Sequence, residues 1–266
     1  MLGAIIGDIV GSRFEWHNYR AKDFEFFSNK CFVTDDSIMS LAVCEAICEA
    51  GDDYMHLGEI TVKAMQRIGR PYPHCGYGGA FLHWMYSDEP APYGSFGNGA
   101  AMRVSGCGFA AKFLDEAKIL SREVTAITHN HPEGLKGAEA TAVAIFLARQ
   151  GKTQAEIKAH IYEHYYNIDF TLDDIRATYE FNETCQNTVP QALEAFFEAQ
   201  SFEDAIRNAI SIGGDSDTIA AITGGIAEAY FGIPKDIRIK ALSFLDERLS
   251  PILERFEAKF PPKIVN

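Results

Sequence analysis

Apolar residues recur every three or four positions along almost the whole chain, and this spacing limits the possible folds more than any other feature. Between Ile219 and Tyr230, for example, Ile222, Thr223 and Ile226 fall on one face of a helix. Runs of Val and Ile with a period of two, which indicate the strands of a large sheet, are nearly absent. The pattern therefore predicts an all-α fold.

The same spacing sets the expected helix boundaries. A short buried helix is expected over residues 1–10, and further helices over residues 36–50, 54–68, 78–86, 114–127, 132–149, 154–164, 190–199, 202–212, 216–231 and 234–249. Pro132, Pro190 and Pro234 are placed in first turns, where proline costs no hydrogen bond. Residues 12–33 show no period and predict a long loop. No linker or composition break divides the chain, so residues 1–266 are expected to form a single domain.

Composition narrows the range of functions. The net charge of −13 argues against a general nucleic-acid-binding or anionic-membrane-binding surface. An anionic small ligand stays possible, because metal ions and backbone N–H groups can hold phosphate without many Lys or Arg residues. The six cysteines form no CxxC pair, which is typical of reduced thiols, and no signal segment or apolar run of spanning length is present. A cytoplasmic protein is expected.

Residues 213–218, with the sequence GGDSDT, precede one of the predicted helices. Asp215 and Asp217 thus stand at a helix N-terminus, where free N–H groups and the helix dipole favour negative charge. Helix capping alone would explain one of these carboxylates. Two carboxylates with Ser216 and Thr218 beside them offer more oxygen atoms than a cap uses, as in sites for hard cations.

A second stretch of the same kind, TDDS at residues 34–37, precedes the helix predicted at 36–50. If the two helix starts face each other, their carboxylates and hydroxyls form a site for one or two divalent ions. Mg²⁺ or Mn²⁺ suits this all-oxygen set better than Zn²⁺, which prefers Cys and His.

Three other stretches carry possible chemistry, each beside a plainer structural interpretation. Residues 3–11 contain three glycines at a spacing that lets a helix or a ligand approach the backbone closely. Glu15 lies between Phe14 and Trp16, where its pKa could be raised for proton transfer, although a solvated surface Glu explains it as well. Residues 94–104, GSFGNGAAMRV, offer loop N–H groups to phosphate or form a structural turn. His129 is interpreted as a ligand contact.

Together these stretches resemble the ADP-ribosylglycohydrolases (ADP-ribosyl-acceptor hydrolases, including the dinitrogenase-reductase-activating glycohydrolases). The resemblance covers essentially the whole chain and follows the family's order: GAIIGDIVGSRFE at 3–15, TDDS at 34–37, GSFGNGAAMRV at 94–104, TH at 128–129 and GGDSDTIAAITGGIAEAYFG at 213–232. It implies a single-domain orthogonal helical bundle with two Mg²⁺ ions, or alternatively Mn²⁺, at the base of an ADP-ribose cleft.

The matching positions imply particular roles. The resemblance implies metal ligands at Thr34, Asp35, Asp36, Asp215, Asp217 and Thr218. Contacts to ADP-ribose are expected at Gly97, Asn98, Gly99, Met102, His129, Gly214 and Ser216. Glu15, with Asp35 and Asp36, is expected to be catalytic, Glu15 transferring a proton to or from water or the leaving group. One departure is Ser37, where the family often has Thr, and it keeps the hydroxyl.

The resemblance implies a metal-dependent hydrolase that releases ADP-ribose from an acceptor. The chain is short for this family, which favours ADP-ribosyl-arginine on protein as the acceptor. The alternatives are serine-linked or nucleotide-linked ADP-ribose, a metal-dependent nucleotide phosphohydrolase, and a non-catalytic, crystallin-like relative that binds ADP-ribose. The expected partner is an ADP-ribosylated protein or small molecule, with no membrane, and the chain is expected to be a monomer.

Overall fold

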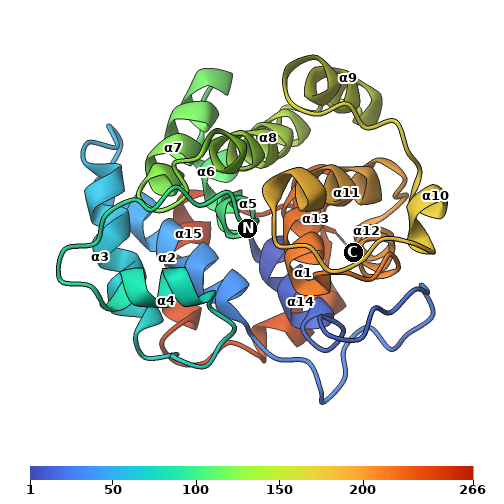
Figure 1. The fold of residues 1–266 in the computed structure, drawn as a ribbon, viewed down its shortest axis with the longest axis horizontal. Helices are drawn as coiled ribbons and strands as arrows, with labels where there is room; N and C mark the ends of the chain where they lie inside the picture. The colour runs from blue at the N-terminus through green and yellow to red at the C-terminus, as the bar shows by residue number, and fades with distance from the viewer. Residues whose placement is uncertain (266) are drawn as a thin grey trace.

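The computed structural model describes residues 1–265 and consists almost entirely of helices (Figure 1). Along the chain the elements are α1 (Leu2–Gly11), α2 (Asp35–Ala50), α3 (Leu57–Gly69), α4 (Gly79–Tyr86), α5 (Gly99–Met102), α6 (Ser105–Ala110), α7 (Leu114–Ala126), α8 (Pro132–Arg149), α9 (Gln154–His164), α10 (Leu172–Arg176), α11 (Cys185–Phe197), α12 (Phe202–Ile210), α13 (Ser216–Phe231), β1 (Ile233–Pro234), α14 (Lys235–Leu242), α15 (Ser250–Lys259) and β2 (Ile264–Val265). Within residues 1–265 the only strands are β1 and β2, which pair in parallel. The expected all-α fold is confirmed.

Helices α1 and α13 form the centre of the molecule and pack against each other more extensively than any other pair of described elements (Figure 1). Their approach is so close that a Cβ atom on Gly3 would lie 2.2 Å from the carbonyl oxygen of Gly224. A Cβ on Gly7 would lie 1.9 Å from the carbonyl oxygen of Ala220, and one on Gly11 would lie 2.5 Å from Cα of Asp217. The glycine spacing therefore allows close helix packing. Because successive glycines of α1 face successively earlier residues of α13, the two helices run antiparallel.

The remaining helices surround this central pair (Figure 1). Helix α2 packs on α1 and is covered by α3 and α15, while α8 contacts α13 and carries α6 and α7 on its other faces. Helices α11 and α12 cover a further side of α13. One continuous apolar core joins all of these layers. No helix within residues 1–265 is long and apolar enough to cross a membrane.

Several local predictions agree with the structure. Helices α8, α9 and α13 have the predicted bounds. The side chains of Thr171 and Ser201 cap α10 and α12 by accepting hydrogen bonds from the backbone N–H groups three residues on. Residues 12–33 contain no strand and no helix, as expected for a loop.

The helix predicted from residue 54 begins at Leu57, and two of the prolines placed in first turns do not lie there. Pro190 lies inside α11, which begins five residues earlier at Cys185 because the buried Cys185 packs against Gly137 of α8. Pro234 belongs to β1 and precedes α14. The single helix predicted over 234–249 is interrupted after Leu242, because the Asp246 carboxylate accepts hydrogen bonds from the N–H groups of residues 248 and 249 and forms a turn.

Candidate metal centre and ligand cleft

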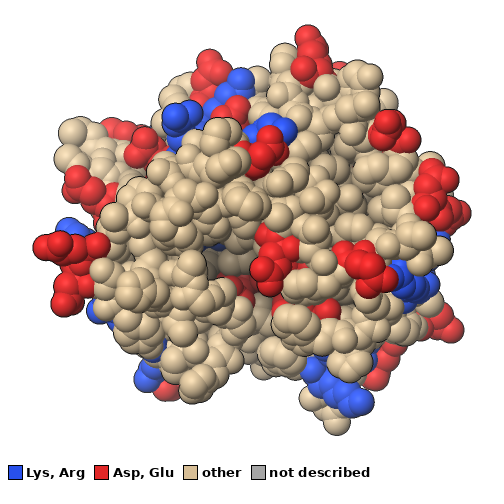
Figure 2. Space-filling view, viewed as in Figure 1, with Lys and Arg blue, Asp and Glu red and all other residues tan. Residues whose placement is uncertain are grey.

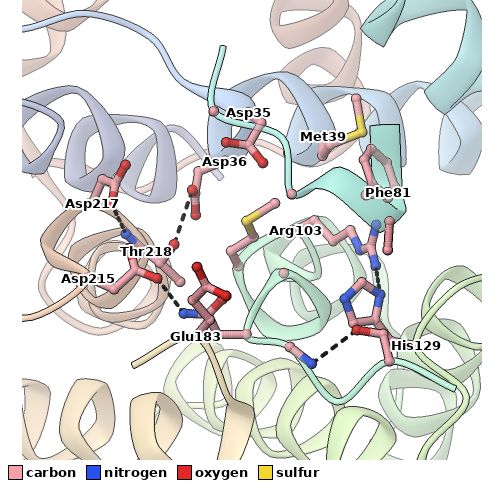
Figure 3. Close-up of a pocket in the computed structure, with 18 of the residues that line it drawn as sticks. Asp35, Asp36, Met39, Phe81, Arg103, His129, Glu183, Asp215, Asp217 and Thr218 are labelled. Carbon is pink, nitrogen blue, oxygen red and sulfur yellow. Dashed lines mark hydrogen bonds between the residues drawn. The ribbon is translucent and has the colours of Figure 1, made fainter. Parts of the chain in front are cut away.

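Three helix ends meet at one point in the fold: the C-terminal end of α1 and the N-terminal ends of α2 and α13 (Figure 3). Carboxylate oxygens of Asp8, Asp36 and Asp217 lie within 4.8 Å of one another, and so do those of Glu15, Asp215 and Asp217. The two acidic stretches of the sequence thus converge, although about 180 residues separate them.

Helix capping does not account for these carboxylates. The cap of α2 is the side chain of Thr34, which accepts a hydrogen bond from the N–H of Asp36 at 3.3 Å. Asp215 occupies the N-cap position of α13, but its side chain makes no capping hydrogen bond. Within residues 1–265 only one of the four motif carboxylates, that of Asp217, accepts a hydrogen bond from a helix-start N–H, that of Thr218 at 2.9 Å. Capping therefore leaves the other three carboxylates unexplained.

Asp8 was not among the predicted site residues, yet it holds two of the helix ends together. Its buried carboxylate accepts hydrogen bonds from the N–H groups of Thr34 at 3.0 Å and Ser37 at 3.1 Å, and from both of their hydroxyls. Asp8 thereby fixes the first turn of α2 against α1. The available sequence signal was a charged residue within an otherwise apolar helix, since all of α1 is buried.

Without a cation, the cluster of buried carboxylates destabilises the folded protein. Burial, followed by the charges of neighbouring carboxylates, raises the pKa of Asp35, Asp36 and Asp217 well above the usual range. Burial also raises the pKa of Asp8 and Asp215 to about 6, against hydrogen bonds that lower it. Like charges packed this closely need an opposite charge among them.

The hydrogen bonds of the two Asp36 carboxylate oxygens bear on whether the cluster fits a divalent cation. Oδ1 of Asp36 is buried and has no hydrogen-bond partner among the described residues. Oδ2 of Asp36 accepts a hydrogen bond from the Thr218 hydroxyl at 3.2 Å, which joins the two acidic motifs directly. An oriented, buried and otherwise unsatisfied carboxylate oxygen is what a hard cation binds. The residues therefore fit such an ion.

A cavity of about 350 Å³ opens above the carboxylates. Figure 2 shows it as a hollow near the middle of one face, with acidic side chains on one side. Of the predicted site residues, those that line it are Glu15, Asp35, Asp36, Gly97, Asn98, Gly99, Met102, His129, Asp215, Asp217 and Thr218. Residues that line it but were not predicted include Phe81, Tyr93, Arg103, Phe181 and Glu183.

Three predicted residues do not line the cavity. Thr34 lies behind the carboxylates, where its hydroxyl donates to Asp8 at 2.6 Å. The N–H of Gly214 donates to the side chain of Asn18 at 2.9 Å, and the Ser216 hydroxyl donates to the carbonyl oxygen of Gly214 at 3.3 Å. Because their polar groups are used within the protein, the structure does not bring Gly214 and Ser216 to the ligand cleft.

Asn98 lines the cavity, but its side chain forms hydrogen bonds with other residues of the protein. Its amide Nδ2 donates to Oδ2 of Asp215 at 2.6 Å and to the hydroxyl of Thr188 at 3.2 Å. Its backbone N–H donates to the carbonyl oxygen of Glu183 at 2.7 Å, which ties the glycine-rich loop to the segment before α11. Asn98 thus orients one carboxylate of the cluster.

His129 and Arg103 form a buried pair at another wall of the cavity (Figure 3). Arg103 donates from Nη2 to Nδ1 of His129, and burial followed by the Arg103 charge lowers the pKa of His129 well below its usual range. Because a guanidinium can only donate, Nδ1 must accept, and the neutral ring carries its proton on Nε2. Nε2 faces Gly97 and Gly99, so His129 presents a hydrogen-bond donor to the cavity.

Glu15 follows α1 at the edge of the cavity and is half-buried. Burial, and then the charges of Asp217 and Asp8, raise its pKa to about 8. The next residue, Trp16, is 72 % exposed and stacks on Phe181 with ring centroids 4.9 Å apart. A carboxyl group with this pKa carries a proton at neutral pH and can release it during a reaction.

The fold and the site together define a class of protein: an all-helical protein with a ligand cleft above a cluster of converging carboxylates. The sequence matches the ADP-ribosylglycohydrolase family over residues 1–262. The chain belongs to this family and is therefore an enzyme, an ADP-ribosylglycohydrolase.

Individual relatives agree with this assignment. The chain is 25 % identical to the ADP-ribosylhydrolase ARH3 of Xenopus tropicalis, over 92 % of this chain and 91 % of the relative. It is 27 % identical to human ARH3, over 88 % and 84 % of the two chains. It is also 27 % identical to the ADP-ribosyl-[dinitrogen reductase] glycohydrolase of Rhodospirillum rubrum, over 84 % and 76 %.

A solved structure, the "ADP-ribosylglycohydrolase-related protein complex", has the same fold. It superposes with a TM-score of 0.71 at 22 % identity and covers 97 % of this chain and 95 % of its own.

Proposed function

We propose that this enzyme uses divalent cations, two Mg²⁺ or alternatively Mn²⁺, to hydrolyse the glycosidic bond between ADP-ribose and an arginine side chain. The observation that carries the proposal is the convergence of carboxylates from α1, α2 and α13 beneath the cleft. Thr34, Asp35, Asp36, Asp215, Asp217 and Thr218 would hold the ions. When bound, such ions position sugar hydroxyls and lower the pKa of a bound water.

The protein's own groups supply positioning and proton transfer. Glu15 lies at the cavity edge, where it would give a proton to the departing nitrogen or exchange one with water. The Nε2–H of His129 and the N–H of Gly99 would hold oxygens of the ADP-ribose, whereas the N–H of Gly97 donates to the Ser95 hydroxyl at 3.2 Å. Asn98 keeps Asp215 in place. Met102 supplies part of the apolar wall.

The charges at the cavity support a cationic acceptor. Arg103 is the one cationic side chain that lines it, and Arg103 is fully buried against His129. Glu183 also lines the cavity, and no Lys or Arg within residues 1–265 forms an ion pair with it. Figure 3 shows the Glu183 carboxylate directed into the cavity. A guanidinium next to Glu183 and the Trp16–Phe181 stack would gain both charge and ring contacts.

The test is release of ADP-ribose from arginine-linked, serine-linked and nucleotide-linked substrates, with and without a chelator. We expect release from the arginine-linked substrate, lost in chelator and restored by Mg²⁺ or Mn²⁺. Release of phosphate with the glycosidic bond intact would show a phosphohydrolase instead. Full release in chelator would refute the metal centre, and preference for the serine-linked substrate would refute the acceptor.

A further inference from the structure

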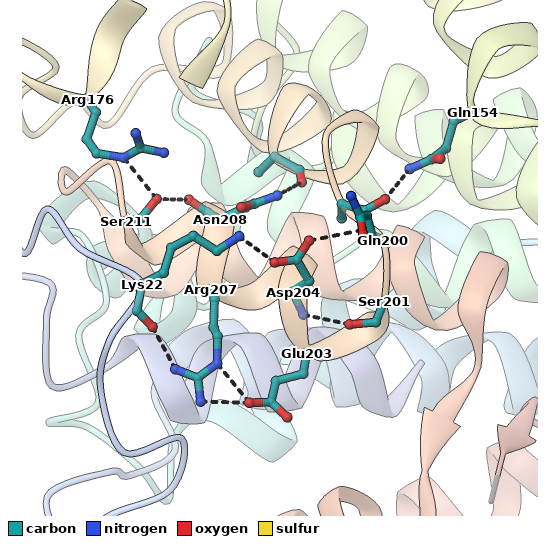
Figure 4. Close-up of polar contacts among 12 residues, drawn as sticks. Lys22, Gln154, Arg176, Gln200, Ser201, Glu203, Asp204, Arg207, Asn208 and Ser211 are labelled. Atoms are coloured by element: carbon teal, nitrogen blue, oxygen red, sulfur yellow. Dashed lines mark hydrogen bonds and ion pairs between the residues drawn. The ribbon is translucent and has the colours of Figure 1, made fainter. Parts of the chain in front are cut away.

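The loop of residues 12–33, which carries Glu15 near its start, is fastened at its middle to helix α12 (Figure 4). Arg207 and Asp204, one turn apart on α12, both contact this loop. The Lys22 ammonium pairs with the Asp204 carboxylate. Arg207 makes the more extensive contact with the loop.

Arg207 binds the loop through hydrogen bonds and through ring contacts. Its Nη1 donates to the carbonyl oxygens of Lys22 at 2.7 Å and Phe24 at 2.8 Å. Its Nε and Nη2 donate to the Glu203 carboxylate at 2.8 Å and 2.7 Å, which fixes the direction of the guanidinium. The guanidinium carbon lies 4.7 Å from the centre of the Phe24 ring and 5.5 Å from that of Phe26. A planar group with several fixed donors is needed for all of these contacts.

The contact reaches Glu15 through two aromatic rings. The ring of Phe24 packs against that of Phe14 with centroids 5.0 Å apart, and Phe14 is buried and directly precedes Glu15. Tyr19 packs against both rings, at 4.8 Å from Phe14 and 5.7 Å from Phe24. On the loop itself, Arg13 lies over Phe14 at 4.4 Å. The loop thus has an aromatic cluster (Phe14, Tyr19 and Phe24), and Arg207 covers the side of it that faces α12.

We propose that Arg207 is a positioning residue for Glu15, acting through Phe24 and Phe14. The proposal rests on the proposed role of Glu15 in proton transfer. Arg207 does not line the cavity, so its effect on turnover is indirect, and its hydrogen bonds to the loop give the shortest route to Glu15. A loop of this length loses much conformational entropy when it is held in one place, and without Arg207 its middle would be less restrained. A displacement of about 1 Å at a proton-transfer group is enough to slow a reaction by about 100-fold.

The first test compares Arg207→Met with Arg207→Lys. We expect kcat for ADP-ribose release to fall about 10- to 100-fold in Arg207→Met, with KM within about twofold of wild type. Arg207→Lys keeps the charge over Phe24 but loses the forked donors, so we expect an intermediate kcat.

The matched control is Arg238→Met. Arg238 lies on α14 and is also partly buried. It forms a bidentate ion pair with Glu257, and both residues are far in sequence from the loop of residues 12–33. Both variants lose a partly buried ion pair, but only Arg207→Met should lower kcat. Equal kcat losses in the two variants at matched folded fractions would overturn the proposal.

The second test measures the loop without relying on turnover. The chain has two tryptophans, and Nε1 of the buried Trp84 has no hydrogen-bond partner, so Trp84→Phe breaks no hydrogen bond and leaves Trp16 as the only fluorophore of its kind. In this background we expect Arg207→Met to lower the fluorescence anisotropy of Trp16, because the loop moves more freely. Arg238→Met should leave the anisotropy unchanged.

The two tests separate the failure of this proposal from failure of the proposed function. Full turnover in Glu15→Gln would refute the proposed role of Glu15, whatever Arg207 does. Unchanged Trp16 anisotropy and unchanged kcat in Arg207→Met would overturn the proposal for Arg207 while leaving the role of Glu15 intact.

Discussion

Buried carboxylates lie at both ends of the α1–α13 pair, and the two ends neutralise them differently. At one end, Glu228 accepts hydrogen bonds from the N-terminal ammonium group of Met1 and from the N–H of Gly3 at 2.6 Å. At the other end, Asp8 and Asp217 approach Asp36 without any Lys, Arg or terminal ammonium partner among residues 1–265. The chain supplies a cation at the first end, whereas the carboxylates at the second end could hold an external one.

The difference shows why the acidic end, and not the Glu228 end, is suited to function. A buried carboxylate with a fixed internal partner cannot exchange that partner for a ligand. A buried carboxylate cluster without one raises the pKa values of its members and creates a strong preference for a divalent ion. The predictions below test this contrast, from the largest expected effect to the smallest.

Asp217→Asn should abolish most of the activity while stabilising the metal-free protein. We expect ADP-ribose release to fall by about 1000-fold or more, since a lost metal ligand is worth several kcal/mol in the transition state. In chelator, removing one buried like charge should raise the free energy of unfolding, because burial and the neighbouring carboxylates disfavour the charged form of Asp217. Enzyme assays and urea unfolding measure the two effects. A metal-free variant less stable than wild type would contradict the contrast.

Glu228→Gln should have the opposite effect on stability. It leaves the Met1 ammonium buried without its counter-charge, so we expect the free energy of unfolding to fall by about 3–5 kcal/mol. Because Glu228 is remote from the cavity, kcat of the folded fraction should stay at the wild-type value. Urea unfolding in parallel with Asp217→Asn gives the comparison. A stable Glu228→Gln variant would show that the ion pair at this end contributes little.

The stabilising effect of Mg²⁺ should depend on pH. The folded-state pKa of Asp8 and Asp215 is about 6, above the 3.8 of an ordinary aspartate, so in chelator their protonated forms favour the folded state below about pH 4. This stability is lost as the pH rises through 6. Thermal unfolding at pH 5 and pH 8 should therefore show a larger Mg²⁺-induced rise in Tm at pH 8. An equal rise at both values would mean that these groups ionise normally.

Glu183→Gln should give the smallest and most selective effect. We expect KM for an arginine-linked substrate to rise by about 3- to 10-fold, the loss of about one charge-assisted hydrogen bond. The serine-linked substrate should be unaffected. Glu163→Gln is the control, since Glu163 is an exposed glutamate on α9 that does not line the cavity. Equal losses on both substrates would show that Glu183 does not recognise the acceptor.

Much of the centre of the molecule was predictable because its sequence signals are local. The helical spacing of residues 216–231 gave α13 with its bounds, and each acidic stretch directly precedes its helix. Their convergence was a spatial hypothesis that composition could not test. The structure supports it through the hydrogen bond between Thr218 and Asp36.

What sequence reasoning missed depends on contacts between distant segments. In the sequence, Asp8 is a single charged residue within an apolar helix. Only the structure shows that Thr34 and Ser37, at the start of α2, donate four hydrogen bonds to it. Pro190 reads as a helix start, but tertiary packing extends α11 backwards to Cys185. The assignment of Gly214 and Ser216 to the ligand followed their motif, whereas their polar groups are used by Asn18 and by Gly214 itself.

The absence of a side chain at Gly11 also bears on which ion the centre accepts. Asp217 can approach Asp8 this closely only because no methyl group separates α1 from α13. Mg²⁺ requires short oxygen distances of about 2.0–2.1 Å and a nearly ideal octahedron, whereas Ca²⁺ tolerates longer ones. We therefore expect a preference for a small ion such as Mg²⁺ over Ca²⁺, and Gly11 would contribute to it without touching the ion.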